Sequence, residues 1–115
     1  MMRRLSGYRF ELLLDFHTAG NCIYYADYDC SAAFRNRCKT LATKFSNASG
    51  YRIALYQGSA GCCNYARHVA GIPAFTVEMI PYVSNPIDCS IFYTEIWNRI
   101  DTMPALAMEL LLAGY

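Results

Sequence analysis

The fold is decided by residues 51–79, YRIALYQGSAGCCNYARHVAGIPAFTVEM. The first six residues are mostly apolar or aromatic and predict a strand that ends at a loop of Gly, Ser and Ala residues. A short helix is expected over residues 62–70, because Gly71 is a typical helix stop. Residues 73–79 then return to strand composition. Strand, helix and strand in this order indicate an α/β fold.

The segments before this stretch continue the same alternation. Residues 8–16 predict a strand that ends in a turn, and residues 22–25 predict a short second strand. A helix is expected over residues 31–46, with Ser31 as its N-cap and Gly50 as its stop. Its apolar positions step by helical intervals along one face: Phe34, Cys38, Leu41, Ala42 and Phe45.

The segments after it predict turns and two further helices. Residues 81–86 are rich in turn formers, and Pro104 should open or kink a last helix that ends near Gly114. Between them, one helix face is expected to enter the core through Phe92, Ile96, Trp97 and Ile100. No internal repeat or linker is apparent, so residues 1–115 are expected to form a single α/β unit.

The composition excludes several classes of protein. Hydrophobic residues make up 55% of the chain and charged residues 17%, and the formal net charge is +1, which argues against disorder and against binding nucleic acid or an anionic membrane. No apolar run approaches the about 18 residues that cross a bilayer, and no signal peptide is recognised, so a cytoplasmic location is the default expectation. Because charge is scarce, we expect another chain to cover part of the surface, as in a homo-oligomer.

The six cysteines are expected to be mainly buried thiols. They form no Cys-x-x-Cys pair, and nothing in the sequence indicates an oxidising compartment. Two cysteine-based alternatives remain open. One is a nucleophile at Cys63 assisted by His68, although five residues of helix separate the two. The other is a structural zinc site drawn from Cys22, Cys30, Cys62, Cys63 and His68, although the spacings resemble neither a zinc knuckle nor a zinc ribbon.

Two polar residues stand where functional side chains collect in α/β sheets. His17 lies just past one predicted strand and Glu78 at the far end of another. If these strands are parallel neighbours, an imidazole and a carboxylate meet at one edge, an arrangement suited to metal binding and general base catalysis. Asp15 shares the strand face of His17 and is a candidate to orient it. The alternative is that His17 caps a turn and Glu78 is merely solvated.

Five separate segments follow one another along the chain: LDFHT (14–18), IYY (23–25), GY (50–51), YQGSAG (56–61) and GIPAFTVE (71–78). In order and spacing they resemble the zinc carboxypeptidase family, and in particular its bacterial branch that cleaves γ-D-glutamyl-diamino acid bonds in peptidoglycan peptides. The resemblance covers nearly the whole chain but only the C-terminal half of the family's catalytic domain. It implies a partial carboxypeptidase-like mixed β-sheet flanked by helices.

The resemblance also implies roles for individual residues. His17 corresponds to the last zinc ligand, and Glu78 to the glutamate that activates the zinc-bound water. Tyr56 corresponds to the mobile tyrosine that closes on substrate, and Cys63 and Asn64 fall in the substrate-binding region. The implied activity is zinc-dependent hydrolysis of peptides, among them cell-wall peptides.

Two departures from the family pattern limit this activity. Asn64 and Tyr65 stand where the family has aspartate and tryptophan, which alters the charge of the pocket. The His-x-x-Glu motif that supplies the other zinc ligands is absent from this chain. We therefore expect a truncated, weakly active or inactive peptidase that needs a separate N-terminal half. The alternative is a non-catalytic remnant that acts as an oligomerising interaction module.

Overall fold

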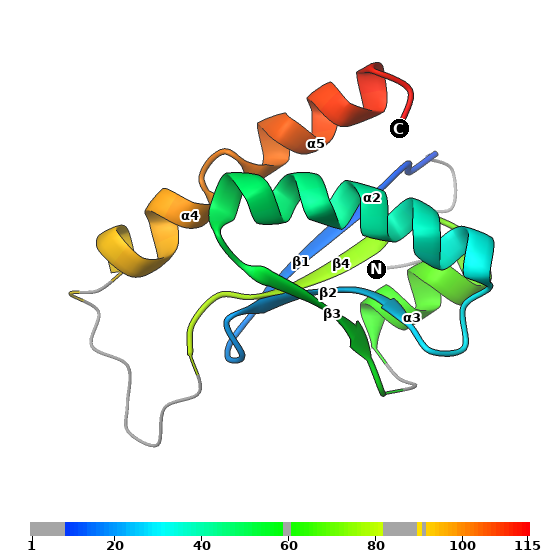
Figure 1. The fold of residues 1–115 in the computed structure, drawn as a ribbon, viewed down its shortest axis with the longest axis horizontal. Helices are drawn as coiled ribbons and strands as arrows, with labels where there is room; N and C mark the ends of the chain where they lie inside the picture. The colour runs from blue at the N-terminus through cyan, green and yellow to red at the C-terminus, as the bar shows by residue number, and fades with distance from the viewer. Residues whose placement is uncertain (1–8, 59–60, 82–89, 91) are drawn as a thin grey trace.

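A mixed four-stranded sheet forms the centre of the protein. The computed structural model describes residues 9–58, 61–81, 90 and 92–115. The strand order is β1-β4-β2-β3, with β4 parallel to β1 and antiparallel to β2, and β2 parallel to β3. The α/β architecture and the flanking helices predicted from the sequence are confirmed (Figure 1). The strands are β1 (Leu13–His17), β2 (Cys22–Asp27), β3 (Arg52–Tyr56) and β4 (Ala74–Glu78).

One face of the sheet is apolar and is covered by α2 (Ala32–Ser49) and α5 (Met103–Leu112), which lie on the same side of the strands (Figure 1). The predicted caps of α2 are present. The Ser31 hydroxyl accepts from the Phe34 N–H, and Gly50 takes the left-handed conformation with φ 79°. The helix therefore runs three residues further than its apolar stripe predicted. The rings of Phe45 and Phe75 pack edge to face across this layer, with centroids 5.3 Å apart.

The opposite face carries polar side chains and is covered only in part, by α3 (Cys62–Tyr65). The predicted helix over residues 62–70 is present but widens after α3 into π-helical turns over Ala66–Ala70, and Gly71 ends it with φ 68°. Because side chains alternate along a strand, Asp15 and His17 of β1 share this face with Glu78 of β4. The open part of the sheet therefore presents the chemically useful residues.

Several sequence predictions need correction or fall outside the described residues. The first strand begins at Leu13 instead of residue 8, and residues 1–8 and 82–89 are not described. After β4 come a π-helical segment (Phe92–Trp97) and the short helix α4 (Asn98–Ile100). Ile96 is buried as expected, but Trp97 is 45% exposed, because the helix face turns outward there.

The cysteines follow the predicted burial with one exception. Of the five described, four are buried and Cys62 is exposed at the start of α3, and all five are free thiols. The sixth, Cys89, lies outside the described residues. Among the described helices, none combines the length and the apolar character needed to cross a membrane.

Candidate functional site

His17 and Glu78 are neighbours at one edge of the sheet. They are the last residues of β1 and β4, and because these parallel strands pair in register, His17 lies directly opposite Glu78. Both side chains leave the carboxyl end of a strand on the same face. The juxtaposition predicted from the sequence is therefore confirmed, while the chemical roles remain predictions.

Asp15 orients the imidazole of His17. The His17 Nε2 lies 2.9 Å from the Asp15 Oδ2, two residues earlier on the same strand face. Because a carboxylate oxygen only accepts, Nε2 carries the hydrogen, and in the neutral imidazole Nδ1 keeps its lone pair. A carboxylate that holds one ring nitrogen while the other is available for a metal is the usual support of a histidine ligand.

The carboxylate of Glu78 is desolvated without being paired. Among buried side-chain nitrogen and oxygen atoms of the described residues, the Glu78 Oε2 stands out because it has no hydrogen-bond partner. Burial raises the pKa of Glu78, the nearby His17 opposes this shift, and the charge of Asp15 adds to it. A carboxylate whose pKa is moved toward neutrality is a better proton acceptor in general base catalysis.

The turn that follows His17 packs against Glu78. A Cβ built on Gly20 would lie 3.1 Å from the Glu78 Cβ and 3.3 Å from its Cγ, closer than side chains normally approach. A larger residue would fit here only if the Glu78 side chain shifted by a few tenths of an ångström. Gly20 was not singled out by sequence reasoning, although its position three residues after a candidate metal ligand was a usable signal.

Cys63 and Asn64 have different surroundings. The Cys63 Sγ lies 4.0 Å from the Asp15 Oδ2, so Cys63 flanks the candidate site from α3. Burial raises the pKa of its thiol, while a hydrogen bond with Thr76 acts in the opposite direction. Asn64 is buried and donates from Nδ2 to the Gly58 carbonyl at 3.3 Å, which ties α3 to the preceding loop.

Tyr56 lies at the other end of the sheet face. It ends β3, which runs opposite to β4, and it pairs with Asp27 instead of approaching Glu78. Its ring packs edge-on against Tyr24, with centroids 5.4 Å apart. The structure thus does not bring Tyr56 to the His17–Glu78 pair.

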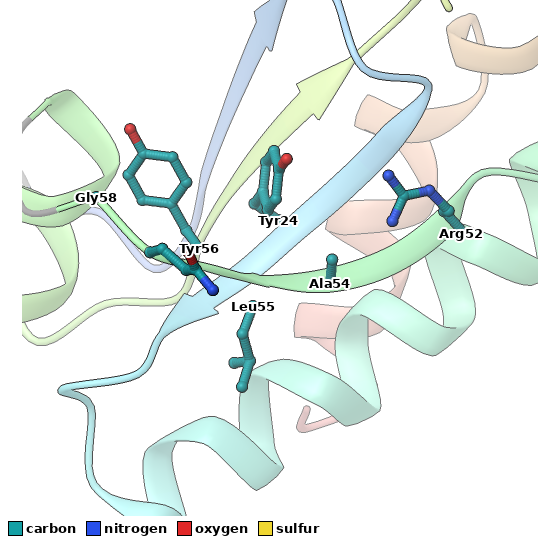
Figure 2. A pocket seen from close by; sticks show the side chains of 7 residues that line it. Tyr24, Arg52, Ala54, Leu55, Tyr56 and Gly58 are labelled. Carbon is teal, nitrogen blue, oxygen red and sulfur yellow. The ribbon is translucent and has the colours of Figure 1, made fainter.

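A pocket of about 350 Å³ extends along β3 between these positions. Figure 2 shows Tyr24, Tyr56 and Arg52 on one side of the sheet, whereas Leu55 points the other way, toward a helix. Arg52 pairs with Cys22, which is itself opposite Glu78. The pocket therefore runs from Arg52, which β2 separates from Glu78, past Tyr56 to Gly58, and its arginine offers a positive charge to a ligand.

A second cluster of ligand-type residues lies away from this edge. Asp27, Cys30 and His68 each offer one atom, and the three atoms lie within 4.8 Å of one another, which makes them a possible metal-binding triad. Cys30 and His68 are among the residues that the sequence suggested for a zinc site, whereas Asp27 is not. The Asp-x-x-Cys spacing at the end of β2 was the available signal. Cys63 and His68 are not paired, because their contacts are to Asp15 and Asp27 respectively.

Comparisons with other proteins do not identify a family. No protein-family model matches the sequence, and a search of curated proteins gives no match. The resemblance to zinc carboxypeptidases therefore remains a prediction that depends on the residues themselves.

Proposed function

We propose that this chain contributes the catalytic base and one metal ligand to a zinc-dependent peptidase site of the carboxypeptidase or γ-D-glutamyl-diamino acid peptidase type. The observation that carries the proposal is the position of Glu78 directly opposite His17, with a buried carboxylate oxygen that has no partner. In this site Glu78 takes a proton from the attacking water, and the Nδ1 of His17 is the atom offered to the metal.

The proposal requires ligands from outside the described residues. Within residues 9–58, 61–81, 90 and 92–115, the three-ligand group is the one around Asp27, and His17 does not belong to any such group. One imidazole does not fix a catalytic zinc, which normally takes three protein ligands. The described residues therefore do not complete a zinc site at His17. A separate N-terminal half is the proposed source of the other ligands, and this chain by itself is expected to be weakly active or inactive.

The surroundings of Glu78 support the role of a base. Burial raises the pKa of Glu78, so proton transfer from water to its carboxylate is less unfavourable than transfer to an ordinary glutamate. The adjoining pocket offers Arg52, Tyr24 and Tyr56 to a peptide. A guanidinium suits a carboxylate of the substrate, and the tyrosines suit its apolar and amide groups.

The test is hydrolysis of cell-wall-derived peptides by the chain with and without zinc, compared between the wild type, Glu78→Gln and Glu109→Gln. Glu109 is exposed on α5 and serves as the matched control. The proposal expects the chain by itself to hydrolyse the peptides slowly or not at all, and it expects any zinc-dependent hydrolysis to be abolished by Glu78→Gln and preserved by Glu109→Gln. Hydrolysis that survives Glu78→Gln would contradict the proposal. A chain that shows no hydrolysis, and whose His17 resonances in NMR spectra are not perturbed by zinc, would contradict it as well.

A second candidate function is the oligomerising interaction module. The observation in its favour is the outer face of α5, where Met108 and Leu112, four residues apart, are 65% and 87% exposed. Exposed apolar side chains on one helix stripe are typical of a contact surface. Sedimentation analysis of the wild type and Leu112→Glu separates the possibilities, because an oligomer that uses this stripe should dissociate in the variant.

A further inference from the structure

We propose that Asp27, Cys30 and His68 form a zinc site, separate from the His17–Glu78 edge, that ties the end of β2 to the helical segment Ala66–Ala70. Asp27 ends β2, whose first residue is the one opposite Glu78. Five residues of strand place Asp27 about 16 Å along the sheet from that edge. The proposal is independent of the peptidase function.

The three ligand atoms have the separations that a metal needs. The Cys30 Sγ lies 3.9 Å from the Asp27 Oδ2 and 4.0 Å from the His68 Nε2, and these two atoms are 2.8 Å apart. The point equidistant from all three is about 2.1 Å from each, close to zinc–oxygen and zinc–nitrogen bond lengths and about 0.2 Å short of a zinc–sulfur bond. Tetrahedral angles require the His68 and Asp27 atoms to separate by about 0.5 Å. His68 can make this movement, because its side chain is 41% exposed.

The shared contact point distinguishes this cluster from a cysteine–histidine catalytic pair. Cys30 and Asp27 both approach the same ring nitrogen of His68, Nε2. In a nucleophilic triad the thiol and the acid would contact opposite nitrogens. Convergence of a thiol, an imidazole and a carboxylate on one point is instead the arrangement of ligands around a metal.

Arg67 holds the carboxylate of Asp27 in place from its other side. The Arg67 NH1 donates to the Asp27 Oδ1 at 2.8 Å, so Oδ2 is the oxygen turned toward Cys30 and His68. Both Asp27 and Arg67 are buried, with side chains 2% and 1% exposed. A ligand carboxylate that is fixed by a neighbouring donor in this way is a common feature of metal sites.

Zinc binding at this cluster has a defined proton balance. The Cys30 thiol loses its proton to solvent and binds as thiolate, and His68 moves its hydrogen from Nε2 to Nδ1 so that the Nε2 lone pair faces the metal. One proton is released for each ion bound. The ion takes the place of the direct hydrogen bond between His68 and Asp27. The exposed side of His68 leaves room for water as the fourth ligand.

Cobalt titration of the reduced, chelator-treated chain tests the proposal, because cobalt(II) substitutes for zinc and reports thiolate binding as a charge-transfer absorption. The expected result is one cobalt ion per chain with this absorption, displaced by zinc. Cys30→Ser should abolish the absorption, and His68→Gln should weaken the affinity at least about tenfold. Circular dichroism establishes that each variant is folded, and His68→Gln is the safer variant because the side chain is exposed.

Two matched controls locate the metal. Cys62→Ser removes the exposed thiol, and Glu109→Gln removes an exposed carboxylate of α5. Both variants should bind cobalt as the wild type does. No thiolate absorption in the wild type, or absorption that persists in both Cys30→Ser and His68→Gln, would leave the cluster as a hydrogen-bonded ion pair and overturn the proposal. Loss of the thiolate absorption in Cys62→Ser would overturn it as well, because the thiolate ligand would then be Cys62 of α3.

Discussion

Replacing Glu78 by glutamine should make the protein more stable at neutral pH. The wild-type carboxylate is buried in part and its Oε2 has no hydrogen-bond partner, so folding removes water from one oxygen of a charged group, and the nearby His17 offsets only part of this cost. Glutamine has nearly the same size and shape and carries no charge. The substitution therefore removes an electrostatic cost while it preserves the packing against Gly20.

The magnitude follows from the cost of an unpaired buried polar group. Leaving such a group unsatisfied costs about 1 to 3 kcal/mol, and the lower end applies because the Glu78 side chain is only partly buried. We expect the free energy of unfolding to rise by about 1 kcal/mol, or about 4 °C in the midpoint of thermal unfolding for a domain of this size.

The pH dependence gives the prediction its sign. Because burial raises the pKa of Glu78, the folded protein binds a proton more tightly than the unfolded chain does. The contribution of Glu78 to stability is therefore fully present below its unfolded pKa and is lost as the pH rises through its folded pKa. The difference between Glu78→Gln and the wild type should be small near pH 4 and should reach its full value at pH 7.5.

Urea unfolding of the two proteins at several pH values measures this difference, and the other titrating groups cancel in it. Glu109→Gln is the control, because an exposed carboxylate should change stability by less than about 0.5 kcal/mol. A Glu78→Gln protein that is less stable than the wild type at pH 7.5, or a difference that does not grow with pH, would refute the argument that the carboxylate is desolvated and unpaired.

Three further predictions concern other parts of the molecule. Gly20→Ala should lower the free energy of unfolding in urea by about 1 kcal/mol, because its Cβ would press on Glu78; an unchanged midpoint would show that the turn yields freely. Arg67→Met should cost about 3 to 5 kcal/mol, because the buried Asp27 carboxylate loses its arginine partner and the carbonyls of Tyr24 and Ala74 lose a donor. Adding Asp27→Asn should recover part of the loss, and additive losses in the double mutant would contradict a direct pairing. Burial raises the pKa of Cys38 to about 11, so an alkylating reagent at pH 8 should modify Cys38 far more slowly than the exposed Cys62. The contribution of Cys38 to stability should fall as the pH rises from about 9 to 11. Equal modification rates of the two thiols in a mass-spectrometric time course would argue against the burial of Cys38.

Much of the fold could be predicted because local signals were strong. The caps at Ser31 and Gly50, the apolar stripe between them and the strand composition of residues 73–79 each specified their own element. The π-helical turns over Ala66–Ala70 had no comparable signal, and neither had the hydrogen bond from Arg67 within them to the Tyr24 carbonyl of β2. Local propensity does not report such long-range contacts.

The candidate site could be predicted only where residues stand at the ends of strands. The proximity of His17 and Glu78 followed from their strand-end positions once β1 and β4 were taken as parallel neighbours. Tyr56 also ends a strand, but β3 runs opposite to β4, so it points to the other end of the sheet. The direction of a strand within a sheet is a tertiary property that local sequence does not report. The contact of Asp27 with His68, 41 residues away, is tertiary too, and the sequence did not reveal it.

Arg67 has a consequence for how the two halves of the sheet are aligned. The pairing between β2 and β4 extends only to Tyr24 opposite Thr76, and beyond it the Arg67 guanidinium donates to the carbonyls of Tyr24 and Ala74. A side chain thus supplies the donors that the main chain would otherwise provide where the strands diverge. If β2 slipped by two residues relative to β4, the Arg67 guanidinium would face other carbonyls and would lose its ion pair with Asp27. A single arginine therefore selects one alignment of two distant strands over its shifted competitors.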